Sequence, residues 1–470
     1  MQTTKTQQFV NKFWDTSILP ALSEYIRIPC VSPSLDVGWE KKGHIMRAAK
    51  FLEQWAKAQK IPGLKSKILK LPGKSPVLYI EIPGSGKNTV VFYGHLDKMP
   101  ESGKWAEGLS AWKPVIKNNW LYGRGAVDDG YAFFSYIAAI KNLEAQKIPY
   151  NRCVLIIEAC EESSSYDFPF YLKKLRSLIG KTELMICLDV AAGDYKKLWL
   201  TSALRGIVKA TLTVKVLNEP VHSGTASGMI PSSFRVMRQL LSRLEDPITG
   251  KILLKSCHTK IPTEQKRAIK DLVKVAGKTI YTSFPMVKGL RPVSQNLSEL
   301  LLNRCWRPAL SITGAGGLPS LQEAGNVVRP ETTLFLSLRI PPFCKPAKIL
   351  HDLEKLFTHN PPYGATVIFK PIAASAGWAN KKIATWLHHE LHKVSKTYFG
   401  ANMLQIGEGG SIGVIPMLNE AFPKAQVILT GVMGQETNEH APNEKLPLAE
   451  AKKMICCISD ILAKQYQNTQ

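Results

Sequence analysis

The hydrophobic pattern predicts helices that alternate with short strands over most of the chain. Apolar residues recur at helical spacing over residues 9–27 and 43–60. The period then changes, because residues 76–83 and 89–93 are short β-branched and aromatic runs bounded by Gly, Pro and Asn, which is typical of strands. Similar segments recur as strands at 153–158, 184–188 and 426–430 and as helices at 131–146, 167–178 and 381–397. Strands buried on both faces that alternate with helices predict an α/β fold with a mixed, mainly parallel sheet and helices on both faces.

The pattern differs between residues 206 and 376. It predicts, in this order, a strand at 207–216, a helix at 231–244, a strand at 332–340, a helix at 345–358 and a strand at 365–371. Such an order indicates a smaller α+β domain inserted into the first. We therefore expect one domain formed by residues 1–205 and 377–470, interrupted by an inserted domain at 206–376.

The net charge raises the question of polyanionic partners. The chain has 470 residues and a formal charge of +24, from 61 Lys and Arg against 37 Asp and Glu. A field this positive favours nucleic acid, anionic lipid or acidic substrates. Its basic pairs, such as Lys41–Lys42 and Lys381–Lys382, are dispersed, and no stretch reaches the ~18 apolar residues of a membrane span. The sequence therefore predicts neither a nucleic-acid partner nor a membrane partner.

Cysteine usage indicates the compartment. Nine cysteines is an odd number, they are spread from Cys30 to Cys457, and no CxxC pair occurs. Several lie in apolar runs, which favours reduced, buried thiols over a disulfide framework. The first residues include no apolar leader segment. We expect a cytoplasmic protein.

Acidic and histidine side chains follow the ends of the predicted strands, where ligands gather in open α/β sheets. His95 and Asp97 come directly after the strand at 89–93. A neutral imidazole can bind a metal through one nitrogen while a carboxylate orients the ring through the other. Taken alone, however, this pair is more often a structural hydrogen bond.

Two further acidic pairs follow the same rule. Asp128 and Asp129 end a glycine-rich turn just before the predicted helix at 131, and adjacent carboxylates repel one another unless cations neutralise them. The alternative is an acid pair that favours a helix N-terminus. Glu161 and Glu162 follow the strand at 153–158, where one could bind a metal and its neighbour could act as general base; solvated loop acids are the alternative.

Asp189 follows the strand at 184–188, and His440 lies near the C-terminus in Glu-His-Ala-Pro-Asn-Glu. Each is a weak signal alone. Five such ligands after separate strands or turns would make two metal sites that share a bridging carboxylate; they are His95, Asp128, Glu162, Asp189 and His440.

The motifs taken together resemble a known family. These motifs are Gly-His-Leu-Asp-Lys-Met-Pro (94–100), Tyr-Gly-Arg-Gly-Ala-Val-Asp-Asp-Gly (122–130), Glu-Glu (161–162), His-Ser-Gly (222–224) and Asn-Glu-His-Ala-Pro-Asn-Glu (438–444). They resemble the di-zinc hydrolases that include carnosinase, PepV dipeptidase, glutamate carboxypeptidase, acetylornithine deacetylase and succinyl-diaminopimelate desuccinylase. The resemblance runs over essentially the whole chain, with the motifs in the family's order.

The resemblance implies a zinc-peptidase-like catalytic domain and a role for each matching residue. Asp128 would bridge two Zn²⁺ ions, with Mn²⁺ or Co²⁺ as possible substitutes. His95 and Asp189 would complete one site, and Glu162 and His440 the other. The resemblance also implies that Glu161 is the general base, that Asp97 orients His95, and that the Asp128–Asp129 peptide is cis.

The inserted domain would be the lid or dimerisation domain, and the resemblance places three of the substrate-binding residues there. His222 would polarise the scissile carbonyl, reaching across a homodimer in similar enzymes. Arg339 and Asn326 would bind the substrate's carboxylate end and backbone, and a guanidinium fork suits a carboxylate. The loop with Gly410 and Ser411 would hold the same terminus. A structural ion pair or loop role is the alternative for these residues.

Several points stay open in the sequence. Val190-Ala191-Ala192 departs from the family pattern after Asp189, which leaves Asp194 as a rival ligand. The substrate is expected to be a dipeptide or short peptide with a free C-terminal carboxylate, with an N-acyl amino acid as the alternative. The presence of Glu161 argues against a non-catalytic homologue. The insert length leaves both a homodimer and a monomer open.

Overall fold

The computed structural model describes residues 2–434 and 436–469 and divides the chain into two compact units. Unit 1 comprises Met1–Ser202, Asn380–Ile406 and Val414–Gln470. Unit 2 comprises Ala203–Ala379 and the short segment Gly407–Gly413. Whether unit 2 acts as a lid or dimerisation domain stays a prediction.

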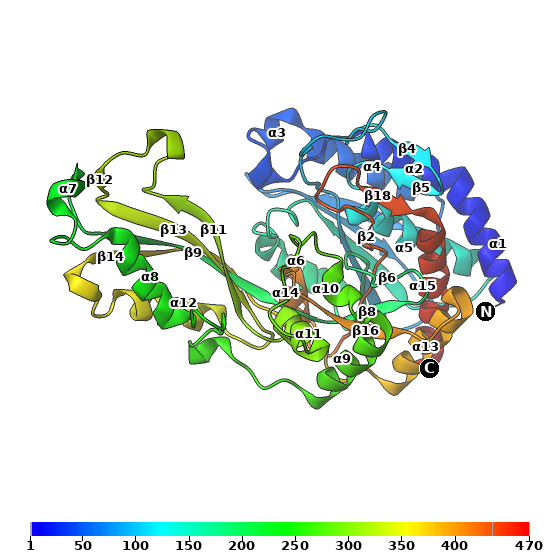
Figure 1. Ribbon diagram of the computed structural model, residues 1–470. Helices are drawn as coiled ribbons and strands as arrows, with labels where there is room; N and C mark the ends of the chain where they lie inside the picture. Colours follow the sequence, from blue (N-terminus) through cyan, green and yellow to red (C-terminus); the bar gives the residue numbers. More distant parts are fainter. Residues whose placement is uncertain (1, 435, 470) are drawn as a thin grey trace. The chain divides into compact units, whose positions relative to one another are not determined.

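Unit 1 is built around a six-stranded sheet with the strand order β1-β2-β6-β3-β7-β17 (Figure 1). Its strands are β1 (Lys65–Leu69), β2 (Val77–Ile82), β3 (Thr89–His95), β6 (Arg152–Glu158), β7 (Thr182–Cys187) and β17 (Gln426–Leu429). The four strands β6, β3, β7 and β17 run parallel, whereas β1 and β2 add an antiparallel edge. The predicted mixed, mainly parallel sheet is therefore confirmed, although the pattern did not reveal β1.

The central strands are buried on both faces, which explains their nearly continuous apolar sequences. On β3, Val90 and Phe92 belong to one large core, whereas the intervening Val91 and Tyr93 are equally buried on the opposite face. The helices that contribute to this core are α1 (Thr3–Phe13), α2 (Leu19–Ile26), α4 (His44–Ala58), α5 (Tyr131–Ala145), α13 (Thr385–Phe399) and α15 (Leu448–Asn468). Two further helices, α6 (Pro169–Ile179) and α14 (Val414–Ala421), contact each other.

A second, three-stranded sheet lies within unit 1 and connects distant parts of the chain. It has the order β18-β5-β4, formed by β4 (Val115–Lys117), β5 (Trp120–Tyr122) and β18 (Lys445–Pro447). Because β18 pairs with β5, the chain around residue 445 lies beside the glycine-rich turn that follows Tyr122. This pairing brings the motif at residues 438–444 next to the motif at residues 122–130.

Unit 2 contains an antiparallel sheet of four strands in the order β11-β13-β9-β14. These are β9 (Gly206–Lys215), β11 (Ala309–Gly316), β13 (Glu331–Ile340) and β14 (Thr366–Ser375). Burial alternates strictly along β9 and β13, and the inward side chains pack on α8 (Ser233–Leu244) and α12 (Pro346–Thr358). Unit 2 also contains α7 (Ser223–Ala226), α9 (Thr263–Ala276), α10 (Thr279–Thr282), α11 (Leu297–Cys305) and the short strands β10 (Val221–His222) and β12 (Val327–Val328).

A short sheet has the order β15-β8-β16, formed by β8 (Trp199–Leu204), β15 (Trp378–Ala379) and β16 (Leu404–Glu408). All nine cysteines are buried and unpaired. Among the described residues, none of the helices is both long enough and apolar enough to cross a membrane.

Candidate metal centre

Three predicted ligands converge at the carboxyl ends of the parallel strands. His95 is the last residue of β3, and Asp189 follows the neighbouring strand β7 by two residues. Asp128 comes from the turn Ala126–Gly130, directly before α5, and its peptide bond to Asp129 is cis, as the resemblance implies. Parallel strands end at the same edge of a sheet, so residues far apart in sequence meet there.

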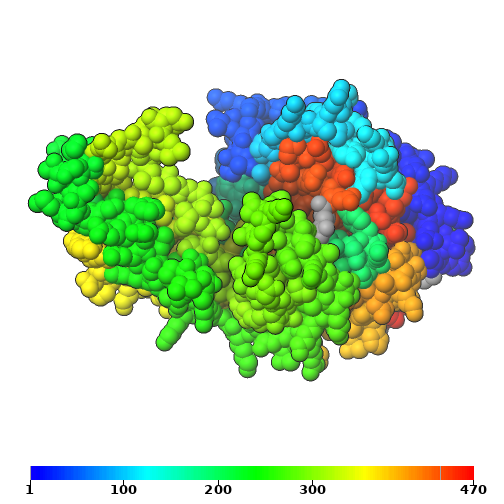
Figure 2. All heavy atoms as spheres, viewed as in Figure 1, coloured from blue at the N-terminus to red at the C-terminus, as the bar shows by residue number. Residues whose placement is uncertain are grey.

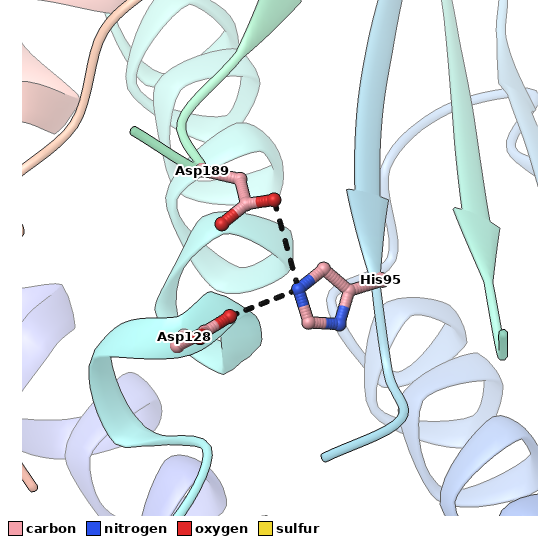
Figure 3. Close-up of side chains that lie close together, drawn as sticks. All are labelled: His95, Asp128 and Asp189. Atoms are coloured by element: carbon pink, nitrogen blue, oxygen red, sulfur yellow. Dashed lines mark hydrogen bonds and ion pairs between the residues drawn. The ribbon is translucent and has the colours of Figure 1, made fainter. Parts of the chain in front are cut away.

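The first triad consists of His95, Asp128 and Asp189 (Figure 3). His95 Nε2 lies 3.0 Å from Asp128 Oδ1 and 3.7 Å from Asp189 Oδ2. All three side chains are buried. Figure 3 shows both carboxylates pointing at the same ring nitrogen from different elements.

The second triad consists of Asp128, Glu162 and His440. His440 Nε2 lies 2.9 Å from Asp128 Oδ2 and 3.0 Å from Glu162 Oε2. Asp128 therefore offers one carboxylate oxygen to each triad. The His440 side chain is 52% exposed, and its segment lies at the surface beside residues 100–120 (Figure 2, red beside cyan).

The electrostatics of these groups show how strongly negative the buried site is. Burial and the neighbouring Asp128 charge together raise the pKa of Glu162 to about 8. Burial also raises the pKa of Asp189 well above its usual value. Asp128 differs, because hydrogen bonds from His440 and His95 outweigh the effect of burial and lower its pKa. Burial would lower the pKa of His440, but these carboxylates raise it to about 11.

The donor set fits two divalent cations. In each triad, three ligand atoms lie within 4.8 Å of one another, and the shared carboxylate joins the two groups. Imidazole nitrogens and carboxylate oxygens bind Zn²⁺, and they also suit Mn²⁺ or Co²⁺. Cations would also neutralise the mutual repulsion of the buried carboxylates.

Asp97 contacts more than its predicted partner. The His95 ring donates from Nδ1 to the backbone carbonyl of Asp97 at 2.9 Å, whereas the carboxylate lies 3.6 Å away. The Asp97 carboxylate instead accepts the backbone N–H groups of Glu161 and Glu162, one on each oxygen, both at 3.1 Å. The Asp97 carboxylate therefore binds the acidic segment directly and lies farther from the His95 ring.

Glu161 belongs to neither triad but lies beside them. Burial raises its pKa to about 8, with further contributions from nearby carboxylates. Its turn is anchored by Ser163, whose hydroxyl accepts the Ser34 backbone N–H at 3.0 Å and lies 2.5 Å from the Ser32 hydroxyl. Glu161 is thus a partly buried carboxyl group in an anchored turn beside two ligand groups.

Asp194, the rival to Asp189, is occupied elsewhere. Its carboxylate accepts the Lys196 backbone N–H at 2.9 Å and pairs with Lys197 Nζ at 2.7 Å. The Trp199 indole N–H also donates to it, at 3.1 Å. Neither triad includes Asp194, so the geometry favours Asp189 over Asp194 as a metal ligand.

The predicted substrate residues all lie in unit 2, where they form two pairs. His222 on β10 pairs with Val327 of β12, and Ser223 N donates to the Asn326 carbonyl at 2.9 Å. Both His222 and Asn326 are exposed. The structure thus brings these two residues together at the β10–β12 ribbon, which lies at one end of unit 2 (Figure 1).

The second pair lies near the opposite end of β13. Arg339 donates from Nη1 to the Ser411 hydroxyl at 3.0 Å, and the Ser411 hydroxyl donates to the Arg205 carbonyl. Gly410 lies exposed beside Ser411. Burial and the Arg339 charge lower the pKa of Arg205 to about 10, so two guanidinium groups share this region. Such a cationic group suits a carboxylate.

Sequence reasoning missed three residues at these sites. Arg205 carried no motif. Arg124 and Glu444 lie inside quoted motifs, yet their buried pairing joins positions 320 residues apart. The sequence does contain a signal for Arg124, which lies between two glycines in a largely apolar segment. A charged side chain in such a segment is expected to be buried and to need a partner of opposite charge.

Comparisons with known proteins show what this chain is similar to. Residues 91–464 match the family described as Peptidase family M20/M25/M40. The Beta-Ala-His dipeptidase of Mus musculus is 25% identical over 410 residues, covering 84% of this chain and 81% of that protein. The Cys-Gly metallodipeptidase of Saccharomyces cerevisiae is 25% identical over 381 residues, covering 77% and 76% of the two chains. A succinyl-diaminopimelate desuccinylase of Pelagibacter ubique is 31% identical, but over 41% of this chain and 48% of its own.

Solved structures support the fold. A dipeptidase from Saccharomyces cerevisiae superposes with a TM-score of 0.78 at 22% identity, covering 100% of this chain and 99% of that one. Human carnosine dipeptidase 1 gives a TM-score of 0.75 at 20% identity, covering 99% of both chains. At this identity the likeness shows the shared fold, and it confirms the predicted fold class.

Proposed function

Because the chain belongs to peptidase family M20/M25/M40, we propose that it hydrolyses dipeptides in a metal-dependent reaction at the two triads. The family match confirms the resemblance and the peptidase class expected from it. The observation that supports the reaction most directly is the shared Asp128 carboxylate, with one oxygen facing each triad. Similarity to a Beta-Ala-His dipeptidase and to a Cys-Gly metallodipeptidase favours a dipeptide substrate.

The proposed ligands are Asp128 as the bridge, His95 with Asp189 on one side, and Glu162 with His440 on the other. The chemistry supplied by bound divalent cations, Zn²⁺ or its substitutes, is the acidification of water and the polarisation of a carbonyl oxygen. Each imidazole would bind a cation as the neutral base, so its proton must leave first.

Glu161 is proposed as the general base. Its carboxylate takes a proton from the attacking water and passes it to the leaving amine. The Asp97 carboxylate holds the Glu161 backbone N–H, which fixes where the base points. Burial raises the pKa of Glu161 to about 8, and a pKa near the working pH suits a group that both takes up and returns a proton.

Substrate selection is assigned to unit 2. Arg339, with Ser411 and the exposed Gly410, would bind the free C-terminal carboxylate, because a guanidinium and a hydroxyl both donate hydrogen bonds. His222 would stabilise the developing oxyanion, and Asn326 would bind the substrate backbone.

A homodimer explains how both pairs could serve one substrate. His222 and Asn326 lie by the start of β13, whereas Arg339 is eight residues after Glu331, so roughly 26 Å of extended strand separates the two ends. A dipeptide is much shorter than this distance. We therefore propose that each site takes Arg339 and Ser411 from one subunit and His222 and Asn326 from its partner.

The cytoplasm is the proposed compartment, supported by nine buried, unpaired thiols. The dispersed basic residues support neither a nucleic-acid nor a membrane partner.

The decisive experiment compares metal-reconstituted wild type with Glu161→Gln on matched panels of dipeptides and N-acyl amino acids, with metal content measured for both proteins. We expect wild type to cleave dipeptides, and Glu161→Gln to keep its metal but lose about 10²- to 10⁴-fold in kcat. Turnover of acylated substrates alone would instead establish an N-acyl amino acid deacylase. Equal kcat for both proteins would reject Glu161 as the base.

A further inference from the structure

Glu444 and Arg124 form an ion pair that is almost entirely shielded from solvent. Glu444 is 0% exposed and Arg124 is 1% exposed. Arg124 Nη1 donates to Glu444 Oε2 at 2.8 Å. The two residues flank the β5–β18 pairing, and Gly123 N also donates to the Glu444 carbonyl at 3.0 Å. An ion pair this deep is costly unless its remaining donors and acceptors are satisfied.

The second oxygen of Glu444 binds the turn that carries Asp128. Glu444 Oε1 accepts the backbone N–H of Val127 at 3.2 Å and that of Asp128 at 3.4 Å. This turn lies between Gly125, which has a positive φ of +78°, and the start of α5. The carboxylate therefore fixes the main chain of the residue shared by both triads.

Arg124 connects the same pair to the other loop. Its Nη2 donates to the Ser102 hydroxyl at 3.4 Å, and this hydroxyl donates to the His440 carbonyl at 3.2 Å. His440 has a positive φ of +61°, which is unfavourable for a residue with a side chain. Because its side chain is half exposed, packing alone holds this residue weakly.

We propose that Glu444 and Arg124 are positioning residues that hold Asp128 and His440 in register for the second metal ion. The proposal rests on the proposed metal centre. Neither residue reaches a ligand position itself, since Glu444 binds the main chain of one ligand's turn and Arg124 reaches the other ligand through Ser102. The ion pair joins the turn that carries Asp128 to the loop that carries His440, and so it fixes the distance between these two ligands.

The charge of Glu444 is essential to this role. A carboxylate accepts on both oxygens, so it accepts from Arg124 Nη1 and from the two backbone N–H groups at once. An amide of the same shape has one acceptor and one donor group. In Glu444→Gln either the guanidinium or the Asp128 turn must therefore lose its acceptor.

The test measures metal binding directly, without substrate. Chelator-stripped wild type, Glu444→Gln and the control Asp460→Asn are titrated with Zn²⁺ against a chromophoric chelator. Asp460 is a matched control, because it is a buried carboxylate that accepts the Tyr398 hydroxyl at 2.8 Å between α13 and α15. We expect Zn²⁺ affinity to fall about 10- to 100-fold in Glu444→Gln, with wild-type affinity in the control.

Cobalt spectra supply the readout that a purely structural role would leave unchanged. With Co²⁺ bound, the visible bands report ligand geometry, so Glu444→Gln should shift them while Asp460→Asn should not. Wild-type Zn²⁺ affinity together with a wild-type Co²⁺ spectrum in folded Glu444→Gln would overturn the proposal.

A second variant keeps the test decisive if Glu444→Gln does not fold. Ser102→Ala removes the hydroxyl that joins Arg124 to the His440 carbonyl and leaves both residues of the Glu444–Arg124 ion pair in place. It should weaken one of the two bound ions several-fold, and unchanged affinity for both ions would refute the proposal. Wild type that binds no divalent cation would overturn the metal centre and this inference together. Wild type that binds two ions but cleaves no dipeptide would overturn the proposed activity alone.

Discussion

The two triads share Asp128 but are held in place differently. In the first, His95 and Asp189 extend from adjacent parallel strands, and all the side chains are buried. In the second, Glu162 comes from a turn and His440 from a surface loop with positive φ. The sheet fixes the first group, whereas hydrogen bonds from distant residues fix the second. Two ligand groups with nearly the same chemistry therefore differ in rigidity, and we expect them to differ in metal affinity, with the sheet-bound group the tighter.

The largest effect is expected from removing Asp128, the residue that the two triads share. Asp128→Ala should lose both ions, because each triad would keep only two ligands. Loss of a residue that only hydrogen-bonds to a ligand lowers metal affinity by up to about 100-fold, and we expect a larger fall in metal affinity for Asp128→Ala. Metal content after dialysis measures this loss. Asp194→Ala is the control, since that carboxylate binds Lys197 instead. A variant of Asp128 that retains one tightly bound ion would show that the triads are independent.

The next prediction separates the triads. His95→Ala should lower the unfolding free energy of the metal-free protein by about 1–3 kcal/mol, because it leaves buried carboxylates without a partner. His440→Ala should cost less, because the His440 ring is half exposed and water screens its interactions with the two carboxylates. Urea unfolding of both metal-free variants measures the difference. Equal losses would mean that the surface loop is as firmly held as the sheet.

A smaller effect is expected where Asp97 holds the acidic turn. Asp97→Asn keeps one acceptor for two backbone N–H groups, so the turn with Glu161 and Glu162 should shift. We expect about a tenfold loss in affinity for the ion on the Glu162 side and no loss on the His95 side. Stepwise chelator titration resolves the two ions. Equal weakening at both would indicate that Asp97 acts mainly through His95.

The smallest effect is on pH dependence. Burial raises the pKa of Glu161 and of Glu162 to about 8, above the usual value near 4.3. The metal-free folded chain therefore binds more protons than the unfolded chain between these values, and its stability should fall as pH rises from 5 to 8. His440, with its pKa raised to about 11, acts in the same direction above pH 6.5.

Thermal unfolding of the metal-free protein should show this as a decrease of a few degrees in Tm between pH 5.5 and 8.5. Glu161→Gln should show a shallower slope, because it lacks one of the titrating groups. Metal-loaded protein should not follow the decrease, since deprotonated ligands bind cations more tightly. A Tm of the metal-free protein that rises over this window would contradict the assignment of these raised pKa values.

Periodicity predicted much of the fold, because the central strands and long helices carry strong patterns. The strands that the pattern did predict lie within a few residues of their predicted bounds, as does the helix at 131–145; these strands are β2, β3, β6, β7, β9, β13, β14 and β17. The part of the site that is attached to the sheet could also be predicted from the sequence, since His95 and Asp189 follow recognisable strands. His440 was different, because no periodic element precedes it and only the family motif identified it.

Other features depend on tertiary contacts that local pattern does not record. The spacing of His95 and Asp97 suggested a shared direction, but the Asp97 carboxylate accepts the backbone N–H of Glu161 instead. The partnership of Arg124 and Glu444 arises from the pairing of β5 with β18, whose sequences are more than 300 residues apart. Short strands of three residues carry too little periodicity to be predicted.

The burial of every cysteine has a consequence for metal supply. Thiolates bind Zn²⁺ strongly, and nine of them would compete with imidazoles and carboxylates if they were accessible. Folding removes this competition, because the thiols are enclosed in the protein interior. Unfolding exposes them again, so excess Zn²⁺ also binds the denatured chain and reduces the stabilisation that the folded site provides. Folding thus prevents the cysteine thiols of the chain from competing with its metal site for Zn²⁺.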